Sequence, residues 1–342
     1  MIASPDPLRL TPLLAALLLT VGCSPPTEQA PSTGADTSVL ASWADTPTRA
    51  RIVDFVESVT REGGASFVAP GDRVAVFDND GTLWSERPVY FQLLYAVDRV
   101  RERGEADPSV LDSDVLRAAA AGDMDGVVAA GHEGLAEIVA ASHAGVTVDE
   151  FQASVRAWLD SARHPTTGRP YTRMVFQPML ELLDYLRANG FRTYITSGGG
   201  VHFMRVFAEE VYGIPPEQVI GSVGRTSYQV VDGAPTLQKD PGIAFIDDGP
   251  GKPVAIEARI GARPILAAGN SDGDFQMLEW TTAGNGPRLG IIVHHTDAER
   301  EWAYDRESPV GRLDRGLDEA QERGWVLVDM AEDWTRVFPD GG

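Results

Sequence analysis

Two carboxylates two residues apart follow a short apolar run, Val74–Phe77, and these acids are Asp78 and Asp80. Such a run is typical of a buried parallel strand, and ligands of open α/β sheets bind beyond the carboxyl ends of the strands. Two close carboxylates repel each other unless a cation or a proton intervenes. A hard cation such as Mg²⁺ would relieve the repulsion and bring phosphate oxygens with it. The simpler alternative is an ordinary acidic turn that ends at Gly81.

A second polar segment, Thr196 to Gly200, follows the apolar strand expected at 192–197 and precedes a helix expected over 201–212. A hydroxyl group and backbone N–H groups at the start of a helix can bind an anion. This segment, with the hydroxyl residues Thr196 and Ser197 at its start, is therefore a candidate anion site. The alternative is a helix cap beside a flexible turn.

A lysine follows the turn Gly249-Pro250-Gly251, and this residue, Lys252, could offset negative charge at the same sheet edge. A lysine in such a place is more often solvated. Lys239 is the competing candidate, but it lies after a hairpin expected around Asp232-Gly233, and no helix follows it.

A third polar run comes after the strand expected at 264–269 and contains Asn270, Asp272 and Asp274. Carboxylate and amide oxygens are ligands for hard cations. The alternatives are a polar turn, or a weak Ca²⁺-binding loop that lacks the glutamate closing an EF-hand loop.

These segments resemble, in order along the chain, the four motifs of the haloacid dehalogenase (HAD) superfamily. Its phosphatases carry Asp-x-Asp-x-Thr after the first strand, which stands here as Asp78-Asn79-Asp80-Gly81-Thr82. The similarity is greatest to phosphoserine-phosphatase-like HAD hydrolases. One departure is Asn270, because the family commonly has aspartate there.

The resemblance implies a Mg²⁺-dependent phosphomonoester phosphatase, in which Asp78 is the nucleophile and Asp80 the general acid and base. The residues expected to bind the substrate phosphate are Thr82, Ser197, Gly198 and Lys252. Those expected to bind the metal are Asp78, Asp80, Asn270, Asp272 and Asp274. The expected substrate is a small phosphorylated metabolite, phosphoserine-like or phosphocholine-like.

Two further observations concern that substrate. Four aromatic residues could line a pocket for an organic cation, although aromatic residues in helices more often form core: Trp84, Tyr90, Tyr95 and Trp158. Glu86 and Arg87 lie near where phosphoserine phosphatases bind the amine of the substrate. The rival hypothesis is a tethered lipoprotein that binds a metal or ligand at the acidic site without turnover.

Alternating apolar strand and amphipathic helix patterns predict an α/β fold, a Rossmann-like parallel sheet with helices on both faces. The expected core comprises residues 49–84 and 176–342. The residues between them, 85–175, read as helices and resemble the helical cap that many HAD enzymes insert after the first motif.

The composition restricts the partners. The 342-residue chain has 43% hydrophobic residues and a net charge of −21, which argues against a nucleic-acid groove. The apolar run Leu8–Val21 predicts a signal peptide over residues 1–22. Cys23 is the only cysteine, and its place resembles the lipidated cysteine of bacterial lipoproteins. We therefore expect a flexible tether over residues 23–48 and an exported, periplasmic or cell-surface protein whose only membrane contact is a lipid anchor on Cys23.

Overall fold

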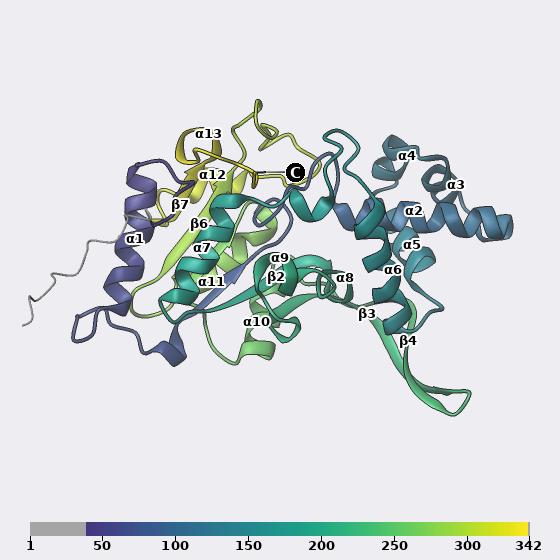
Figure 1. Cartoon of the computed structure of the whole chain (residues 1–342), viewed down its shortest axis with the longest axis horizontal. Helices are drawn as coiled ribbons and strands as arrows, with labels where there is room; N and C mark the ends of the chain where they lie inside the picture. The colour runs from purple at the N-terminus through teal and green to yellow at the C-terminus, as the bar shows by residue number, and fades with distance from the viewer. Residues whose placement is uncertain (1–38, 341–342) are drawn as a thin grey trace, which may run out of the picture. The chain divides into compact units, whose positions relative to one another are not determined.

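The computed structural model describes residues 39–340. A seven-stranded sheet with the order β4-β3-β2-β1-β5-β6-β7 forms their centre (Figure 1). The strands are β1 (Val74–Phe77), β2 (Arg192–Gly200), β3 (Val219–Val231), β4 (Ala234–Phe245), β5 (Leu266–Gly269), β6 (Leu289–His294) and β7 (Val326–Asp329). All neighbouring pairs are parallel except β3 and β4. The expected α/β class is confirmed.

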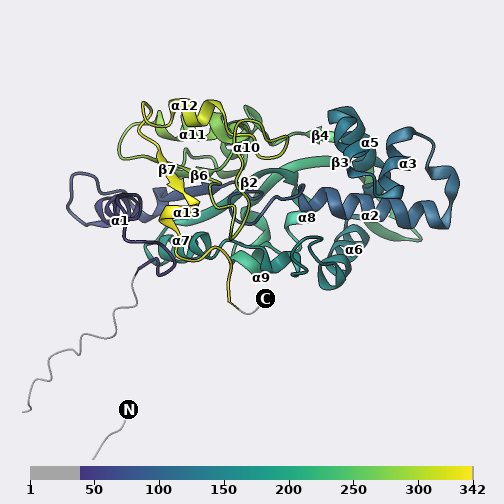
Figure 2. The ribbon, with the colours of Figure 1, turned by 90° about the horizontal axis from the view of Figure 1, so that it is seen from above.

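Helices cover both faces of the sheet because its central strands are apolar on both sides. In β1, Ala75 and Phe77 belong to one buried cluster, whereas Val74 and Val76 belong to another, as the alternation of a strand requires. The first cluster includes residues from α1 (Pro47–Thr60), α7 (Gln177–Ala188), α8 (Val201–Met204), α9 (Ala208–Tyr212) and α13 (Met330–Asp333). The second packs against α10 (Gly251–Ile260), α11 (Phe275–Thr282) and α12 (Arg315–Glu319). Figure 2 shows α10–α12 on one side of the sheet and α7 and α9 on the other.

A group of helices lies between β1 and α7 in the sequence. They are α2 (Phe91–Ala106), α3 (Asp114–Ala121), α4 (Met124–Ala129), α5 (Gly131–His143) and α6 (Val148–Ser161). Helices α2–α5 share a small apolar core of their own, to which Leu93, Leu116, Val127 and Ile138 contribute. Helix α6 begins at Thr147, where a capping box satisfies the first backbone N–H groups. The boundaries of the cap at residues 85 and 175 stay a prediction.

A long antiparallel hairpin made of β3 and β4 reaches these helices (Figure 1). Its turn has Asp232 and Gly233 at positive φ, 50° and 80°, as a two-residue hairpin turn requires. The backbone of Lys239 in β4 bonds to the loop between α5 and α6. Its N–H donates to the Val146 carbonyl (2.9 Å), and its carbonyl accepts from the Gly145 N–H (3.0 Å). The hairpin is thus attached to the inserted helices.

The single helix expected over 201–212 is two short helices, α8 and α9, and the physical reason is Phe207. Its backbone leaves the helical region at φ −124°, and its fully buried ring stacks on Trp84 with centroids 4.5 Å apart. Packing of aromatic side chains therefore overrides the local helical pattern at Phe207.

The N-terminal predictions fall mostly outside the described residues. The signal peptide, Cys23 and tether residues 24–38 lie there, so export and anchoring stay predictions. The tether is wrong over residues 39–48, because Trp43 is buried against Trp334 and its indole N–H donates to the Pro178 carbonyl (2.9 Å). Between residues 39 and 340, no helix is long and apolar enough to cross a membrane.

Candidate active site

The turn after β1 holds the first two acidic residues of the site. The Asp78 N–H donates to the Ala268 carbonyl in β5 (2.9 Å), so the carboxylate is fixed at the carboxyl end of the central strand. Asp80 accepts a hydrogen bond from the indole N–H of Trp84 (2.8 Å). Gly81 has a φ of 73°, and a Cβ there would collide with the Asn270 amide and the Glu86 carboxylate. A glycine is therefore required for this turn to close.

Lys252, in the first turn of α10, joins two of the acidic segments. Its Nζ donates to Asp78 Oδ1 and Asp274 Oδ1, at 2.6 Å each, and to the Thr196 carbonyl at 3.0 Å. The side chain is only 2% exposed. Burial works to lower the pKa of Lys252, but the carboxylates of Asp274 and Asp78 outweigh it and raise that pKa. The raised pKa keeps the ammonium group charged. Of the two candidate lysines, Lys252 is the one that contacts the carboxylates of Asp78 and Asp274.

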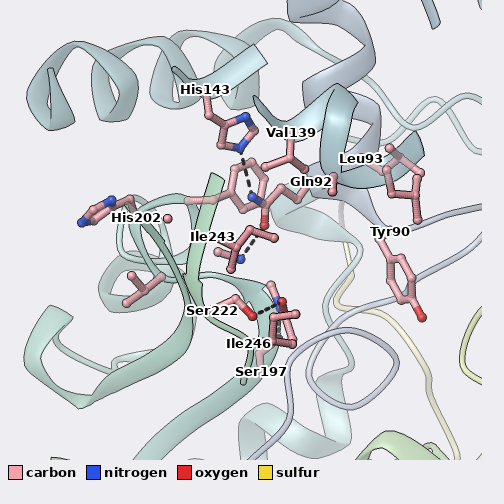
Figure 3. A pocket seen from close by; sticks show the side chains of 18 of the residues that line it. Tyr90, Gln92, Leu93, Val139, His143, Ser197, His202, Ser222, Ile243 and Ile246 are labelled. Atoms are coloured by element: carbon pink, nitrogen blue, oxygen red, sulfur yellow. Dashed lines mark hydrogen bonds between the residues drawn. The ribbon is translucent and has the colours of Figure 1, made fainter. Parts of the chain in front are cut away.

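The glycine-rich end of β2 faces the same place. The Ser197 N–H and the Thr196 hydroxyl both donate to Asp247 Oδ2, at 3.1 Å each. The Ser197 hydroxyl oxygen accepts from the Gly199 N–H (3.1 Å), which leaves its own hydrogen available. Burial raises the pKa of Asp247 to about 6. Asp247 was not among the expected site residues, and Figure 3 shows Ser197 among the residues lining a cavity.

Asn270 and Thr82 contact each other instead of the cavity. The Thr82 hydroxyl donates to Asn270 Oδ1 (3.1 Å), and both residues are at most 1% exposed. Neither of them lines the cavity. Thr82 therefore orients the amide of Asn270 in this structure, and the phosphate contact expected of it stays a prediction.

Two of the expected metal ligands are fully engaged with protein groups. Asp272 accepts hydrogen bonds from the backbone N–H groups of Asp314, Arg315 and Gly316, at 2.9–3.2 Å, and so caps α12. Asp274 receives Lys252 on one oxygen and the Asn270 and Ser271 N–H groups on the other, at 2.9 and 3.1 Å. In this structure Asp272 is thus a cap and Asp274 the anchor of Lys252, and their expected roles as metal ligands stay predictions.

Glu86 is a site residue that the expected metal and phosphate sets did not include. It is 2% exposed, and its Oε1 accepts from the Asn270 amide (2.7 Å) and the Tyr304 hydroxyl (2.9 Å). Burial raises its pKa to about 7, although the nearby His295 opposes the shift. A carboxylate six residues beyond Asp80 was visible in the sequence, but Tyr304 is over two hundred residues away, so the pairing was not.

A cavity of about 450 Å³ opens between these residues, the inserted helices and the hairpin. Asp78, Asp80, Ser197 and Lys252 form what we name its strand end, and His143, His202 and Lys239 form its hairpin end. Figure 3 shows Ser197 apart from His143 and His202, with Ile243 and Ile246 between them. The apolar side chains lining it are Leu93, Leu135, Ala136, Val139, Ala140, Ala144, Phe151, Val201, Phe203, Ile243 and Ile246.

The strand end has the oxygen donors and the excess negative charge that a hard cation requires. In the described part of the chain, no three His, Cys, Asp or Glu side chains form a group that could hold a metal ion. A mixed set remains, the carboxylates of Asp78 and Asp80 with the amide oxygen of Asn270. Burial raises the pKa of Asp78, and Asp274 and Asp80 add to the effect against the attraction of Lys252. One ammonium thus leaves these acids under-neutralised, and the residues fit a further cation such as Mg²⁺.

Comparison with known proteins agrees with this arrangement. The model of the haloacid dehalogenase-like hydrolase family matches residues 75–279, and the chain belongs to this family. A search of curated proteins found no match.

The chain is similar to several solved structures at low sequence identity. A functionally unknown protein from Anaerococcus prevotii DSM 20548 has a TM-score of 0.51 and 17% identity, over 80% of this chain and 89% of its own. A protein of unknown function from Bordetella pertussis Tohama I has a TM-score of 0.48 and 18% identity, over 76% and 99%. A phosphoserine phosphohydrolase-like protein from Francisella tularensis has a TM-score of 0.37 and 17% identity, over 73% and 98%. The match of the family model makes the protein a HAD-family hydrolase.

Proposed function

We propose that this protein is a Mg²⁺-dependent phosphomonoester phosphatase that acts through a phosphorylated Asp78. The observation that supports it most is the position of Lys252, whose Nζ lies 2.6 Å from both Asp78 and Asp274 at the end of a cavity. Phosphoryl transfer brings an anionic nucleophile to an anionic substrate, so fixed positive charge at that point is its main requirement.

The first half-reaction uses the two acids of the β1 turn. Lys252 holds Asp78 Oδ1, which leaves Oδ2 to attack phosphorus. The bond between phosphorus and the ester oxygen breaks, and Asp80 gives its proton to the leaving alkoxide. Burial raises the pKa of Asp80, against the opposing hydrogen bond from Trp84, which favours the protonated form that a general acid needs.

The second half-reaction restores the enzyme. The Asp80 carboxylate takes a proton from a water molecule, whose oxygen attacks the phosphorus of the aspartyl-phosphate. Inorganic phosphate leaves, and Asp78 is again a carboxylate. The Ser197 hydroxyl and the Gly198 N–H hold the phosphoryl oxygens at the end of β2. Asp247 fixes the Ser197 backbone by accepting its N–H, and the Gly199 N–H orients the Ser197 hydroxyl.

The residues that would hold Mg²⁺ are Asp78, Asp80 and Asn270. When bound, the ion supplies positive charge to the phosphoryl oxygens. Thr82 and Glu86 fix the two ends of the Asn270 amide, at 3.1 and 2.7 Å, so the orientation of its oxygen is set by protein groups on either side.

The test is phosphate release from 4-nitrophenyl phosphate and from a panel of alkyl phosphates, measured with Mg²⁺ and after chelation. We expect turnover that requires Mg²⁺ and a phosphorylated peptide containing Asp78 in acid-quenched samples. If no ester in the panel releases phosphate, the proposal is wrong. Calorimetric binding of inorganic phosphate by such an inactive protein would then favour the rival ligand-binding role.

We also propose that the chain is exported and held at a membrane by a lipid on Cys23. The support is the sequence alone: the apolar run Leu8–Val21 and the single cysteine after it. The native protein should fractionate with membranes, and Cys23→Ser should release it, because stable attachment depends on acyl chains. Recovery of the wild-type protein in the soluble periplasmic or secreted fraction would contradict anchoring, and recovery in the cytosol would contradict export.

A further inference from the structure

The chain contains only two lysines, Lys239 and Lys252, among its 29 basic residues. Both line the same cavity, and both are buried, at 6% and 2% exposure. No arginine lines that cavity in the described part of the chain. The two ammonium groups are therefore the fixed positive charges that a ligand in the cavity can meet.

Their surroundings differ. Lys252 is paired with two carboxylates, whereas Lys239 forms no ion pair within residues 39–340. Its Nζ donates to His202 Nδ1 (3.3 Å) and lies 4.4 Å from the centroid of the Phe151 ring. Burial and the nearby Lys239 lower the pKa of His202 to about 4, so the imidazole is neutral near pH 7 and leaves the charge of Lys239 uncompensated.

A buried ammonium without a carboxylate partner is costly. Burial lowers the pKa of Lys239. The backbone at this residue is also held in place, which keeps the side chain at the cavity. Its backbone is bonded on both sides to the loop at Gly145 and Val146. Strand β4 thus carries a cation over the cavity and keeps it there.

We propose that Lys239 binds a second anionic group of the substrate, a carboxylate or a further phosphate, at the hairpin end of the cavity. This inference rests on the proposed phosphatase function, and it names the substrate class. Between the two ends lie the apolar side chains of Val139, Ile243 and Ile246. The one amide among them, Gln92, is already bonded to His143 and to the Gly200 N–H. The matching substrate is a phosphomonoester whose phosphoryl group and second anion are separated by an aromatic or branched aliphatic spacer.

The same geometry argues against a phosphocholine-like substrate. Three of the aromatic residues considered for binding an organic cation, Trp84, Tyr95 and Trp158, are buried in the core and do not line the cavity. Tyr90 does line it, as do Phe151 and Phe203, but the Phe151 ring already packs against the ammonium of Lys239. The lysine at the hairpin end would repel a cationic substrate.

The kinetic test compares phenyl phosphate with its 3- and 4-carboxylated derivatives. For each protein, kcat/KM for the carboxylated ester is divided by kcat/KM for phenyl phosphate. We expect this ratio to be about tenfold to a hundredfold lower in Lys239→Met than in the wild type, the usual range for a hydrogen bond to a charged group. Comparing this ratio between the two proteins cancels the difference in leaving group and any difference in the fraction of folded protein. Arg225→Met is the matched control, because Arg225 is an exposed cation on the same hairpin outside the cavity. An equal ratio in wild type and Lys239→Met overturns the proposal.

A second measurement needs no turnover. With only two lysines, amine-selective reductive methylation followed by peptide mass spectrometry reports on Lys239 directly. We expect 4-phosphonobenzoate to protect Lys239 from methylation and phenylphosphonate to protect it less. Protection without hydrolysis of any ester would disprove the phosphatase and leave the anion site standing. Hydrolysis of the esters with no differential protection and no change in the kinetic ratio would disprove the anion site alone.

Discussion

The strand end and the hairpin end of the cavity each hold one buried lysine, but in opposite electrostatic situations. At the strand end, Lys252 compensates two carboxylates, Asp78 and Asp274, at 2.6 Å each. At the hairpin end, Lys239 contacts a neutral imidazole and an aromatic face. At the strand end the protein has excess negative charge, which a further cation would balance. At the hairpin end it has an unpaired positive charge, which an anion would balance. The strand end is therefore suited to the chemical step, and the hairpin end is suited to substrate recognition.

The largest expected effect is on the nucleophile at the strand end. Asp78→Asn should abolish turnover, because the amide nearly preserves the shape of the side chain but is a poor nucleophile. The variant should remain folded, so its thermal unfolding measured by circular dichroism should match that of the wild type. Near wild-type phosphate release from the purified variant would contradict the division of the cavity into a reactive and a recognising end.

The second effect concerns the proton donor. Asp80→Asn should lower kcat for alkyl phosphates on the order of 10²–10⁴-fold, the usual contribution of general acid catalysis. The loss should shrink for 4-nitrophenyl phosphate, whose leaving group needs little protonation. Steady-state kinetics with both esters measure the difference. An equal loss for the two classes of ester would count against Asp80 as the acid.

A stability comparison of the two lysines comes next. Lys252→Met should lower the free energy of unfolding by about 3–5 kcal/mol, since it leaves buried carboxylates without their partner. Lys239→Met should change it by less than about 1 kcal/mol, because the lysine has no carboxylate to abandon and its own desolvation cost disappears. Urea denaturation of both variants without added metal checks this. Comparable losses would show that the two sites are not electrostatically opposite.

An effect smaller than that of Lys252→Met is expected from the pH dependence that His143 contributes at the hairpin end. Its Nε2 faces the Gln92 amide nitrogen (3.1 Å) and its Nδ1 the Ser142 hydroxyl (2.5 Å). Burial, aided by Lys239, lowers its pKa to about 3. The unfolded chain therefore binds the extra proton first as pH falls below about 6.5, and the native state loses stability.

This loss between pH 7 and pH 5 should be about 2 kcal/mol. His143→Gln, which cannot titrate there, should lack this component of the loss. Urea unfolding at both pH values measures it, with the difference between wild type and variant as the readout. Parallel losses in the two proteins would mean that His143 is protonated in the native state as readily as in the unfolded chain.

The sequence determined the fold class and the strand end of the cavity to a large extent. Short apolar runs that end in polar residues define strands whose carboxyl ends meet at one edge of a parallel sheet. This rule places Asp78 and Ser197 together from the sequence alone. Lys252 follows a turn, so its place among them came from the resemblance to the HAD motifs. The order of the segments also matched the family to which the chain belongs.

Only the tertiary structure decided which polar atoms are already engaged. Asp272 and Asp274 look alike in the sequence, but one caps α12 and the other holds Lys252. Thr82 and Glu86 are joined through Asn270. Such assignments depend on which backbone N–H groups lie within 3 Å or so, and distant segments supply many of those groups.

The hairpin end was equally beyond the reach of the sequence. Lys239 reads there as a residue in the tail of a hairpin, and its burial depends on three separate elements: the α5–α6 loop, α6 and α8. Local patterns record the period of a strand or helix, so they reveal which face of an element is apolar. They do not record the long-range packing that removes a charge from water, and that packing is what turns Lys239 into a binding group.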